Sequence, residues 1–303
     1  MERLSKLGQR VASKIRRTLA ARRGSAAYWS TYTVAEREFT SKEQSKRHYE
    51  WRSSQYVDYL ALMPVHTVSD KVVLDYGCGP GNDIIGMLEE SRPSRLIGAD
   101  VSENALEKAK ARAGLHGYEV ELLKISERDT QLPLPEKSVD YIHSSGVLHH
   151  VSNLENTLAE LHRVLKDGGE MRVMVYNQNS IWFHLNAAYL ERRKLPQFGA
   201  EITNEEIFKR TTDGKECPIS RAYVPNHFVD LVCKKGFDGR YLGAAIAMQE
   251  MKILDCRFDA ILDERLEQEH RDFLLDLKFD DRNIPYFHGH IAGLDGCYSF
   301  IKL

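Results

Sequence analysis

The sequence predicts an α/β fold in which helices cover both faces of a doubly wound, mostly parallel sheet. An apolar run at 72–76, VVLDY, breaks into a glycine-rich turn and then into a helical pattern. A second apolar run, 95–101, brings a carboxylate, Asp100, about 20 residues after that turn. Strand and helix patterns continue to alternate as far as Tyr176. Such alternation is typical of parallel strands joined by crossover helices.

The turn after the first strand carries three glycines, Gly77, Gly79 and Gly81. Glycine lets a backbone approach a ligand where a Cβ would collide, and a strand–turn–helix unit forms a nucleotide-sized crevice at the carboxyl edge of the sheet. The dinucleotide fingerprint needs glycines at the first, third and sixth places, but the sixth place holds Asn82 or Ile84. No Lys-Ser/Thr pair follows either, which argues against NAD, FAD and P-loop ligands.

Local signals place the remaining elements. Ser102 is the expected N-cap of a helix, and Asn153 caps another whose leucines share one face. Gly168-Gly169 is expected to end that second helix. The helix after Ser102 is expected to cover 103–114, and two further helices are expected at 182–190 (amphipathic) and 225–235. The expected strands cover 118–124, 171–176, 240–247 and 297–302, and a loop with the fourth strand is expected within 132–144.

The first strand and turn read D-x-G-x-G-x-G from Asp75 to Gly81, which resembles motif I of the Rossmann-like (class I) S-adenosylmethionine-dependent methyltransferases. The segments 132–144 and 146–151 also resemble this family, so the likeness covers about Val72 to Tyr176. It implies a seven-stranded sheet with an antiparallel last strand, S-adenosyl-L-methionine as cofactor and methyl transfer as the reaction.

The resemblance also implies which residues bind the cofactor. Asp100 matches the acid that binds the ribose, and Ser126 stands where many members have an adenine-binding aspartate, with Glu127 and Asp129 as nearby substitutes. Arg52 is expected to hold the methionine carboxylate, or else to form a surface ion pair beside a core tryptophan. The full expected set is Arg52, Asp75, Gly77, Cys78, Gly79, Asp100, Val101, Ser126 and Ser145.

His149 and His150 follow the fourth strand and are the expected catalytic residues. A hydroxyl acceptor needs a base, and histidine titrates near neutral pH. Neighbouring side chains point apart, so only one of the two can face the methyl group. His149 is favoured because it comes first after the strand end and is expected to lie nearer the methyl group. A structural role, with one ring bonded to the backbone, is the alternative. His288 and His290 have no third ligand at a suitable spacing, so no metal is expected.

Composition narrows the class of protein. The chain has 303 residues, of which 42% are hydrophobic, and a formal net charge of −2, which gives no footprint for nucleic acid. The Asn/Asp-Pro-Pro-Tyr signature of base methylation is absent too. Five cysteines without a CxxC pair suit a reducing cytoplasm. A small-molecule substrate is therefore expected, and the oligomeric state stays open.

The first 27 residues form a segment of their own, predicted as a basic amphipathic helix. Such a helix can lie on an anionic membrane surface, dock on a partner protein, act as a transit peptide or pack on its own domain. The rest, 28–303, is expected to be the methyltransferase domain. It divides into an N-terminal cap (28–70), a cofactor-binding half (71–177) and two insertions, 178–224 and 251–290, that form a helical substrate cap.

Two functions from different classes follow. The first is O- or N-methylation of a small molecule such as a sugar, a lipid-linked precursor or a secondary metabolite. The second is a catalytically inactive cofactor-binding protein that acts as a partner or regulatory subunit.

Overall fold

The computed structural model describes residues 24–32, 37–126 and 130–303. The predicted N-terminal helix therefore lies outside the described residues except at its C-terminal end, where α2 (Ser25–Thr31) begins. No helix in the described ranges combines the length and the apolar character needed to cross a membrane.

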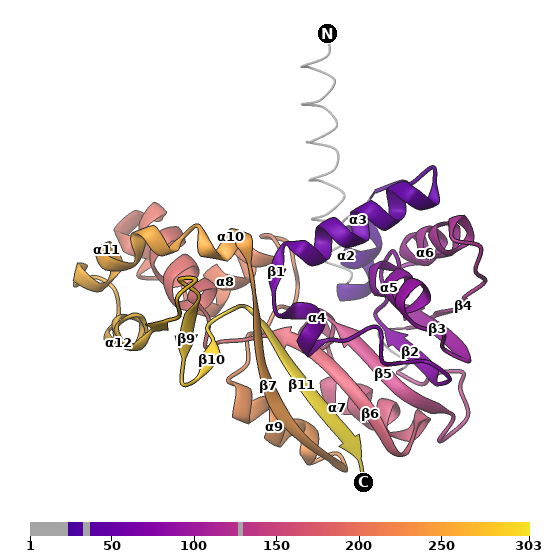
Figure 1. The fold of residues 1–303 in the computed structure, drawn as a ribbon. Helices are drawn as coiled ribbons and strands as arrows, with labels where there is room; N and C mark the ends of the chain where they lie inside the picture. Colours follow the sequence, from indigo (N-terminus) through magenta and orange to yellow (C-terminus); the bar gives the residue numbers. More distant parts are fainter. Residues whose placement is uncertain (1–23, 33–36, 127–129) are drawn as a thin grey trace.

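The main sheet has eight strands in the order β1-β7-β11-β6-β5-β2-β3-β4 (Figure 1). The five strands from β6 to β4 run parallel, and β11 pairs antiparallel with both β6 and β7. This confirms the mostly parallel sheet with an antiparallel last strand, and the two-residue β1 adds an eighth strand at the edge. The strands are β1 Tyr56–Val57, β2 Val72–Tyr76, β3 Arg95–Asp100, β4 Glu121–Lys124, β5 Val139–Ser145, β6 Leu165–Tyr176, β7 Phe237–Ala247 and β11 Asp295–Lys302.

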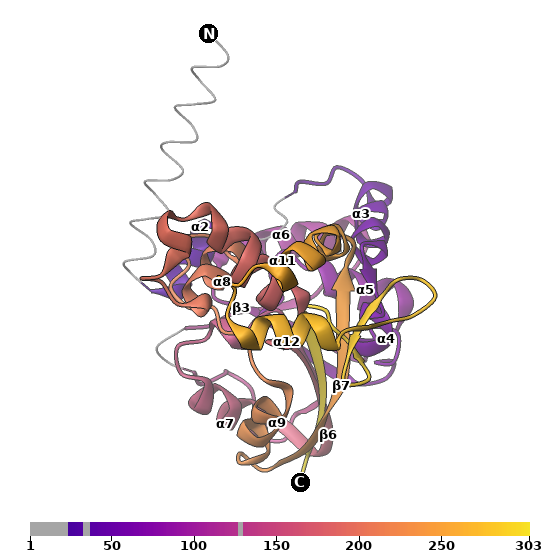
Figure 2. The ribbon, with the colours of Figure 1, turned by 90° about the vertical axis from the view of Figure 1, so that its left-hand side faces the viewer.

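Helices cover both faces of this sheet because neighbouring strand residues point to opposite sides. Leu74 joins a core beneath α7 and α9, whereas Val73 joins a core beneath α3, α5 and α6. Figure 2 shows α7 and α9 on one side of the sheet and α3 and α5 on the other. The bounds are α3 Lys42–Ser54, α4 Tyr59–Leu62, α5 Asn82–Glu90, α6 Glu103–Leu115, α7 Leu154–Val164 and α9 Pro225–Cys233.

The predicted caps are confirmed. Ser102 Oγ accepts a hydrogen bond from the Ala105 N–H at 3.2 Å, and Asn153 Oδ1 accepts one from the Asn156 N–H at 3.1 Å. The predicted end of α7 is wrong, because the helix ends at Val164 and β6 starts directly afterwards. The pairing of β6 with β5 jumps from Leu165 to Glu170, so the glycine pair sits in a bulge within the strand.

The two insertions pack against each other beyond the β7 edge. The predicted helix at 182–190 is a π-helix, Trp182–Glu191, and its residues 183–190 are all buried, so it is not amphipathic. Its partners are α11 and α12 and the small sheet β10-β9-β8, which come from the second insertion. The bounds are α8 Asn204–Thr212, α10 Met248–Met251, α11 Arg257–Leu262, α12 Gln268–Asp276, β8 Lys278–Phe279, β9 Pro285–Phe287 and β10 His290–Ile291.

Candidate active site

A cavity of about 660 Å³ opens at the carboxyl ends of β2, β3, β5 and β6, a volume usual for a small-molecule site. Helices α2 and α3 contribute to its wall. The expected cofactor residues all line it, namely Arg52, Asp75, Gly77, Cys78, Gly79, Asp100, Val101, Ser126 and Ser145. Glu127 and Asp129, the substitutes for the adenine contact, lie outside the described residues.

The three glycines of the turn have different reasons to be glycine. All adopt a positive φ, which glycine tolerates best. A Cβ on Gly79 would meet nothing within 4 Å, whereas one on Gly77 would collide with Val147 and one on Gly81 would press on Ala109 at 3.2 Å. Packing therefore explains Gly77 and Gly81, whereas the space beside Gly79 is open and could admit a ligand. This corrects the expectation that all three make room for a ligand.

Asp100 holds the turn in place as well as facing the cavity. Its Oδ2 accepts a hydrogen bond from the Gly79 N–H at 2.9 Å, and its Oδ1 accepts one from the Ser102 N–H at 2.7 Å. Burial raises the pKa of this carboxyl, and the backbone donors offset part of the effect. Each carboxylate oxygen has further acceptor capacity, so ribose hydroxyls could donate to Asp100 without breaking these bonds.

Asp75 offers an unpaired acceptor in the same cradle. Its Oδ2 is buried and has no hydrogen-bond partner, and burial raises the pKa of the carboxyl to about 7. A buried polar atom without a partner is costly unless a ligand satisfies it. Together with the open space above Gly79, this atom fits the expected cofactor.

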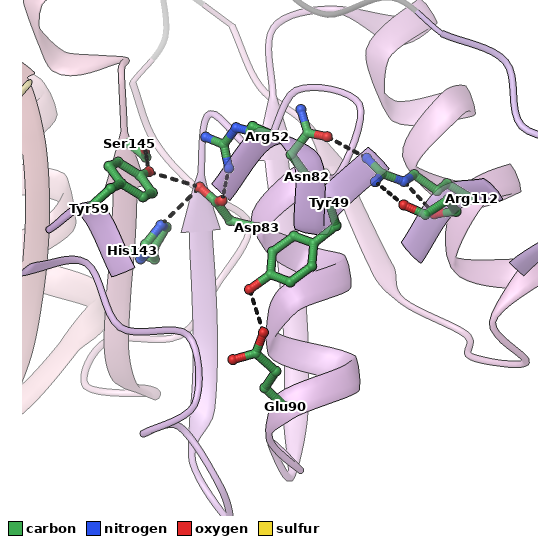
Figure 3. A network of polar contacts seen from close by, with 10 residues as sticks. Tyr49, Arg52, Tyr59, Asn82, Asp83, Glu90, Arg112, His143 and Ser145 are labelled. Atoms are coloured by element: carbon green, nitrogen blue, oxygen red, sulfur yellow. Dashed lines mark hydrogen bonds and ion pairs between the residues drawn. The ribbon is translucent and has the colours of Figure 1, made fainter. Parts of the chain in front are cut away.

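Asp83, in the first turn of α5, is the centre of a buried network that the sequence analysis did not single out (Figure 3). Its Oδ1 lies 2.5 Å from Arg52 Nη1, and its Oδ2 lies 3.2 Å from His143 Nε2. Burial favours the neutral acid, but Arg52 and His143 outweigh it and lower the pKa of Asp83. Tyr59 extends the network, with its hydroxyl 2.5 Å from Ser145 Oγ.

Arg52 forms an ion pair, which was the alternative to binding the methionine carboxylate. The pair does not lie on the surface, because Arg52 lines the cavity and Asp83 is buried. The neighbouring Trp51 is 52% exposed and is not a core tryptophan.

A second buried arginine fixes α3 above the turn (Figure 3). Arg112 of α6 donates from Nε to Ser45 Oγ at 2.7 Å and from Nη1 to Asn82 Oδ1 at 2.5 Å. These bonds tie α3, α5 and α6 together. They hold Arg52, on the same helix as Ser45, at the cavity wall.

The two adjacent histidines lie on a short 3-10 turn, Leu148–His150. His149 was expected to face the ligand, but His150 is the one that faces the cavity. His149 is fully buried, its ring packs on Tyr176 with centroids 3.8 Å apart, and neither ring nitrogen has a hydrogen-bond partner. His150 lines the cavity. The preference for His149 as the residue that faces the ligand is therefore corrected in favour of His150.

Hydrogen bonding fixes the tautomer of His150. Its Nδ1 lies 2.7 Å from the carbonyl oxygen of Ile219, which only accepts, so Nδ1 carries the proton and Nε2 keeps a free lone pair. Asp213 Oδ1 lies 3.7 Å from Nε2. Burial lowers the pKa of His150, with Asp213 and the carbonyl opposing that effect. Trp29 of α2 covers the ring from the other side, with centroids 4.6 Å apart.

Asp213 comes from the first insertion and was not predicted as a site residue. Its Oδ1 accepts a hydrogen bond from the Tyr176 hydroxyl at 2.8 Å, and its Oδ2 accepts one from Ser220 Oγ at 2.6 Å. The second insertion, 251–290, contributes no described residue to the cavity wall. No local signal marks Asp213, since it stands in a polar loop far from the motifs.

One group, of which His150 and Asp213 line the cavity, has the residue types of a metal site. The ligand atoms of His150, Asp213 and Cys217 all lie within 4.8 Å of one another. Burial raises the pKa of Cys217 to about 12, and its Sγ lies 3.2 Å from the Ile219 carbonyl oxygen. His150 and Cys217 both contact the Ile219 carbonyl oxygen, and Asp213 accepts hydrogen bonds from Tyr176 and Ser220. His288 and His290 are exposed and belong to no such group among the residues described.

Comparison with known proteins identifies the domain type. The family profile of a methyltransferase domain matches residues 67–223. A demethylmenaquinone methyltransferase of Listeria welshimeri is 33% identical over 160 residues, 51% of this chain and 63% of that protein. The enzyme of the same name from Geobacillus stearothermophilus is 36% identical over 201 residues, 62% of this chain and 81% of that protein.

The chain spans less than two thirds of the length of the first curated relatives it matches, namely 40% of one and 63% of the next. Among solved structures, a putative S-adenosylmethionine-dependent methyltransferase from Listeria monocytogenes superposes with a TM-score of 0.50 at 16% identity. The superposition covers 85% of this chain and 99% of the Listeria protein. At this low identity the likeness shows the fold alone.

Proposed function

Because the chain belongs to the class I S-adenosylmethionine-dependent methyltransferase family, with its domain at 67–223, we propose that it methylates a small molecule bound beside His150. The observation that carries this proposal is His150 on the cavity wall, whose Nδ1 is held by the Ile219 carbonyl oxygen and whose unprotonated Nε2 lies 3.7 Å from Asp213 Oδ1. Methylation of a hydroxyl, or of an amine that binds in its protonated form, needs a proton to leave the acceptor, and this nitrogen could take it.

The cofactor is S-adenosyl-L-methionine. We assign its ribose to Asp100 and its methionine end to the surface formed by Asp75, Gly79 and Arg52. Arg52 has one guanidinium edge engaged by Asp83, and its remaining donors could bind a carboxylate, since guanidinium has five N–H groups. Ser126 and Ser145 complete the proposed set.

The bound cofactor supplies an activated methyl group: a lone pair of the acceptor bonds to the methyl carbon, and the carbon–sulfur electron pair stays on sulfur. His150 Nε2 removes the proton that the acceptor loses. Asp213, 3.7 Å away, stabilises the imidazolium that results. Trp29 and Tyr176 pack around the base and limit the access of water.

The enclosed cavity supports a small acceptor, such as a sugar, a lipid-linked precursor or a secondary metabolite. The names of two relatives mention demethylmenaquinone, but we do not propose it as the substrate of this chain. The matches cover 51–62% of this chain, and the family domain ends at residue 223, short of the cavity residues Gln249 and Asp295.

The test uses the full chain with S-adenosylmethionine labelled in the methyl group and a fractionated small-molecule extract. We expect S-adenosylhomocysteine to form together with one labelled metabolite, and His150→Gln to slow both by about a hundredfold. His149→Leu is the matched control and should retain activity. Label transfer that is unchanged in His150→Gln, or that goes to protein or nucleic acid instead, would contradict the proposal.

A further inference from the structure

Asp295, the first residue of β11, presents a buried carboxylate to the cavity. It pairs with Tyr176 of β6 on one side and Ala245 of β7 on the other, so it stands beyond the strands that carry the cofactor residues. Its side chain lines the cavity, although the residue is only 7% exposed. This end of the cavity is also lined by Tyr56 and Gln249.

The carboxylate of Asp295 has no hydrogen-bond or ion-pair partner among the described residues. Its neighbour Glu250 is the contrast, because Glu250 accepts hydrogen bonds from the Ala247 and Leu294 N–H groups at 2.8 and 2.9 Å. Burial, opposed only by the distant charge of Arg52, raises the pKa of Asp295 to about 7. A buried carboxylate without a partner lowers the stability of the fold unless a ligand donates a hydrogen bond or a positive charge to it.

The charge of the cavity favours a cation. Its described wall holds one arginine and no lysine, and Nη1 of this arginine is paired with Asp83. Against this single cation stand five aspartates, Asp75, Asp83, Asp100, Asp213 and Asp295. An anionic acceptor would be repelled, whereas an ammonium would be attracted.

We propose that Asp295 recognises an ammonium group of the methyl acceptor, so that the substrate is a small amine-bearing molecule. This deepens the proposed function and depends on it. Tyr56 and Tyr176 also line the cavity, and aromatic rings can attract a cation. The acceptor extends from Asp295 towards His150, the residue proposed to take the proton.

The test compares three probes of one skeleton: tyramine, its alcohol analogue tyrosol and 4-hydroxyphenylacetate. Each is titrated by calorimetry into the full chain, with and without saturating S-adenosylhomocysteine. We expect tyramine to bind about tenfold or more tightly than tyrosol, because a charge-assisted hydrogen bond replaces a neutral one, and the carboxylate to bind least.

Asp295→Asn keeps the size of the side chain and should abolish the preference for tyramine while S-adenosylhomocysteine still binds. Glu250→Gln is the matched control, because this neighbouring acid faces backbone N–H groups, and it should keep the preference. Thermal melting checks that both variants fold.

Equal binding of tyramine and tyrosol, absence of tyramine binding, or a preference that persists in Asp295→Asn would overturn the proposal. So would a loss of S-adenosylhomocysteine affinity in Asp295→Asn with the preference intact, which would assign Asp295 to the ammonium of the cofactor. Failure of the wild type to bind S-adenosylhomocysteine would instead count against the proposed cofactor site, because the tyramine comparison is also made without it.

Discussion

Arg52 Nη1 lies 2.5 Å from Asp83 Oδ1, and this ion pair joins α3 to the helix that follows the glycine turn. Asp83 also contacts His143 of β5, so one carboxylate connects the sheet, the turn and the overlying helix. The cofactor crevice therefore depends on this buried acid as well as on the glycines of the turn.

Asp83→Asn should destabilise the fold by about 3 kcal/mol, because it leaves the Arg52 charge without its buried partner. Urea denaturation followed by circular dichroism measures the loss. Tyr49→Phe is the control on the same layer: it removes one hydrogen bond, to Glu90 at 2.7 Å, and should cost about 1 kcal/mol. An equal decrease in the free energy of unfolding in the two variants would show that the ion pair stabilises the fold no more than a single hydrogen bond does.

Gly79→Asn and Gly77→Asn should fail in different ways. Asparagine tolerates a positive φ, so at Gly79 its side chain should enter the open cavity and block S-adenosylhomocysteine while the protein stays folded. At Gly77 the side chain would strike Val147 and lower stability by about 2 kcal/mol or more. Calorimetric binding and thermal melting distinguish the two. Wild-type affinity in folded Gly79→Asn would place the ligand elsewhere.

Asp100→Ala should reduce the affinity for S-adenosylhomocysteine by about 2–4 kcal/mol, through loss of the ribose contacts and of the acceptor that holds the Gly79 N–H. Asp100→Asn keeps the shape and one acceptor oxygen, and its loss should be smaller. Isothermal titration of both variants measures the difference. Unchanged affinity in Asp100→Ala would remove the ribose assignment.

Turnover should rise with pH through the pKa of His150 and then level off, because only the neutral ring can take a proton. Burial lowers this pKa from 6.5, so the plateau should begin below the usual range for histidine. Initial rates at saturating cofactor and acceptor provide the profile. His150→Gln should lose this acid limb, and a limb retained in that variant would assign the base to another group.

Stability should fall as pH rises towards neutrality, in part because of Asp75. The folded pKa of this carboxyl is about 7, against an ordinary value of 3.8, so between these values the folded state holds a proton that the unfolded state has released. The contribution is complete below 3.8 and is lost as pH rises through about 7. Asp75→Asn should flatten this decline in urea titrations. An identical slope in the variant would show that Asp75 titrates normally.

The sequence by itself determined the fold class, the cofactor through the family resemblance, and nine of the residues that line the cavity. These depend on local order, because a strand, a glycine turn and a helix place Asp75, Gly79 and Asp100 at one sheet edge wherever they occur in this succession. Hydrophobic alternation and capping residues likewise act over a few positions, so most elements could be predicted from short windows.

The tertiary structure alone decided which histidine faces the cavity and what surrounds it. His149 and His150 lie on a 3-10 turn, so the packing of one ring on Tyr176 turns the other towards the ligand. Asp213 and Asp295 reach the wall from a distant loop and from the last strand, with no motif around them. Asp213 meets the hydroxyls of Tyr176 and Ser220, whereas Asp295 meets no side-chain partner among the described residues. These surroundings arise only when segments far apart in the chain pack together.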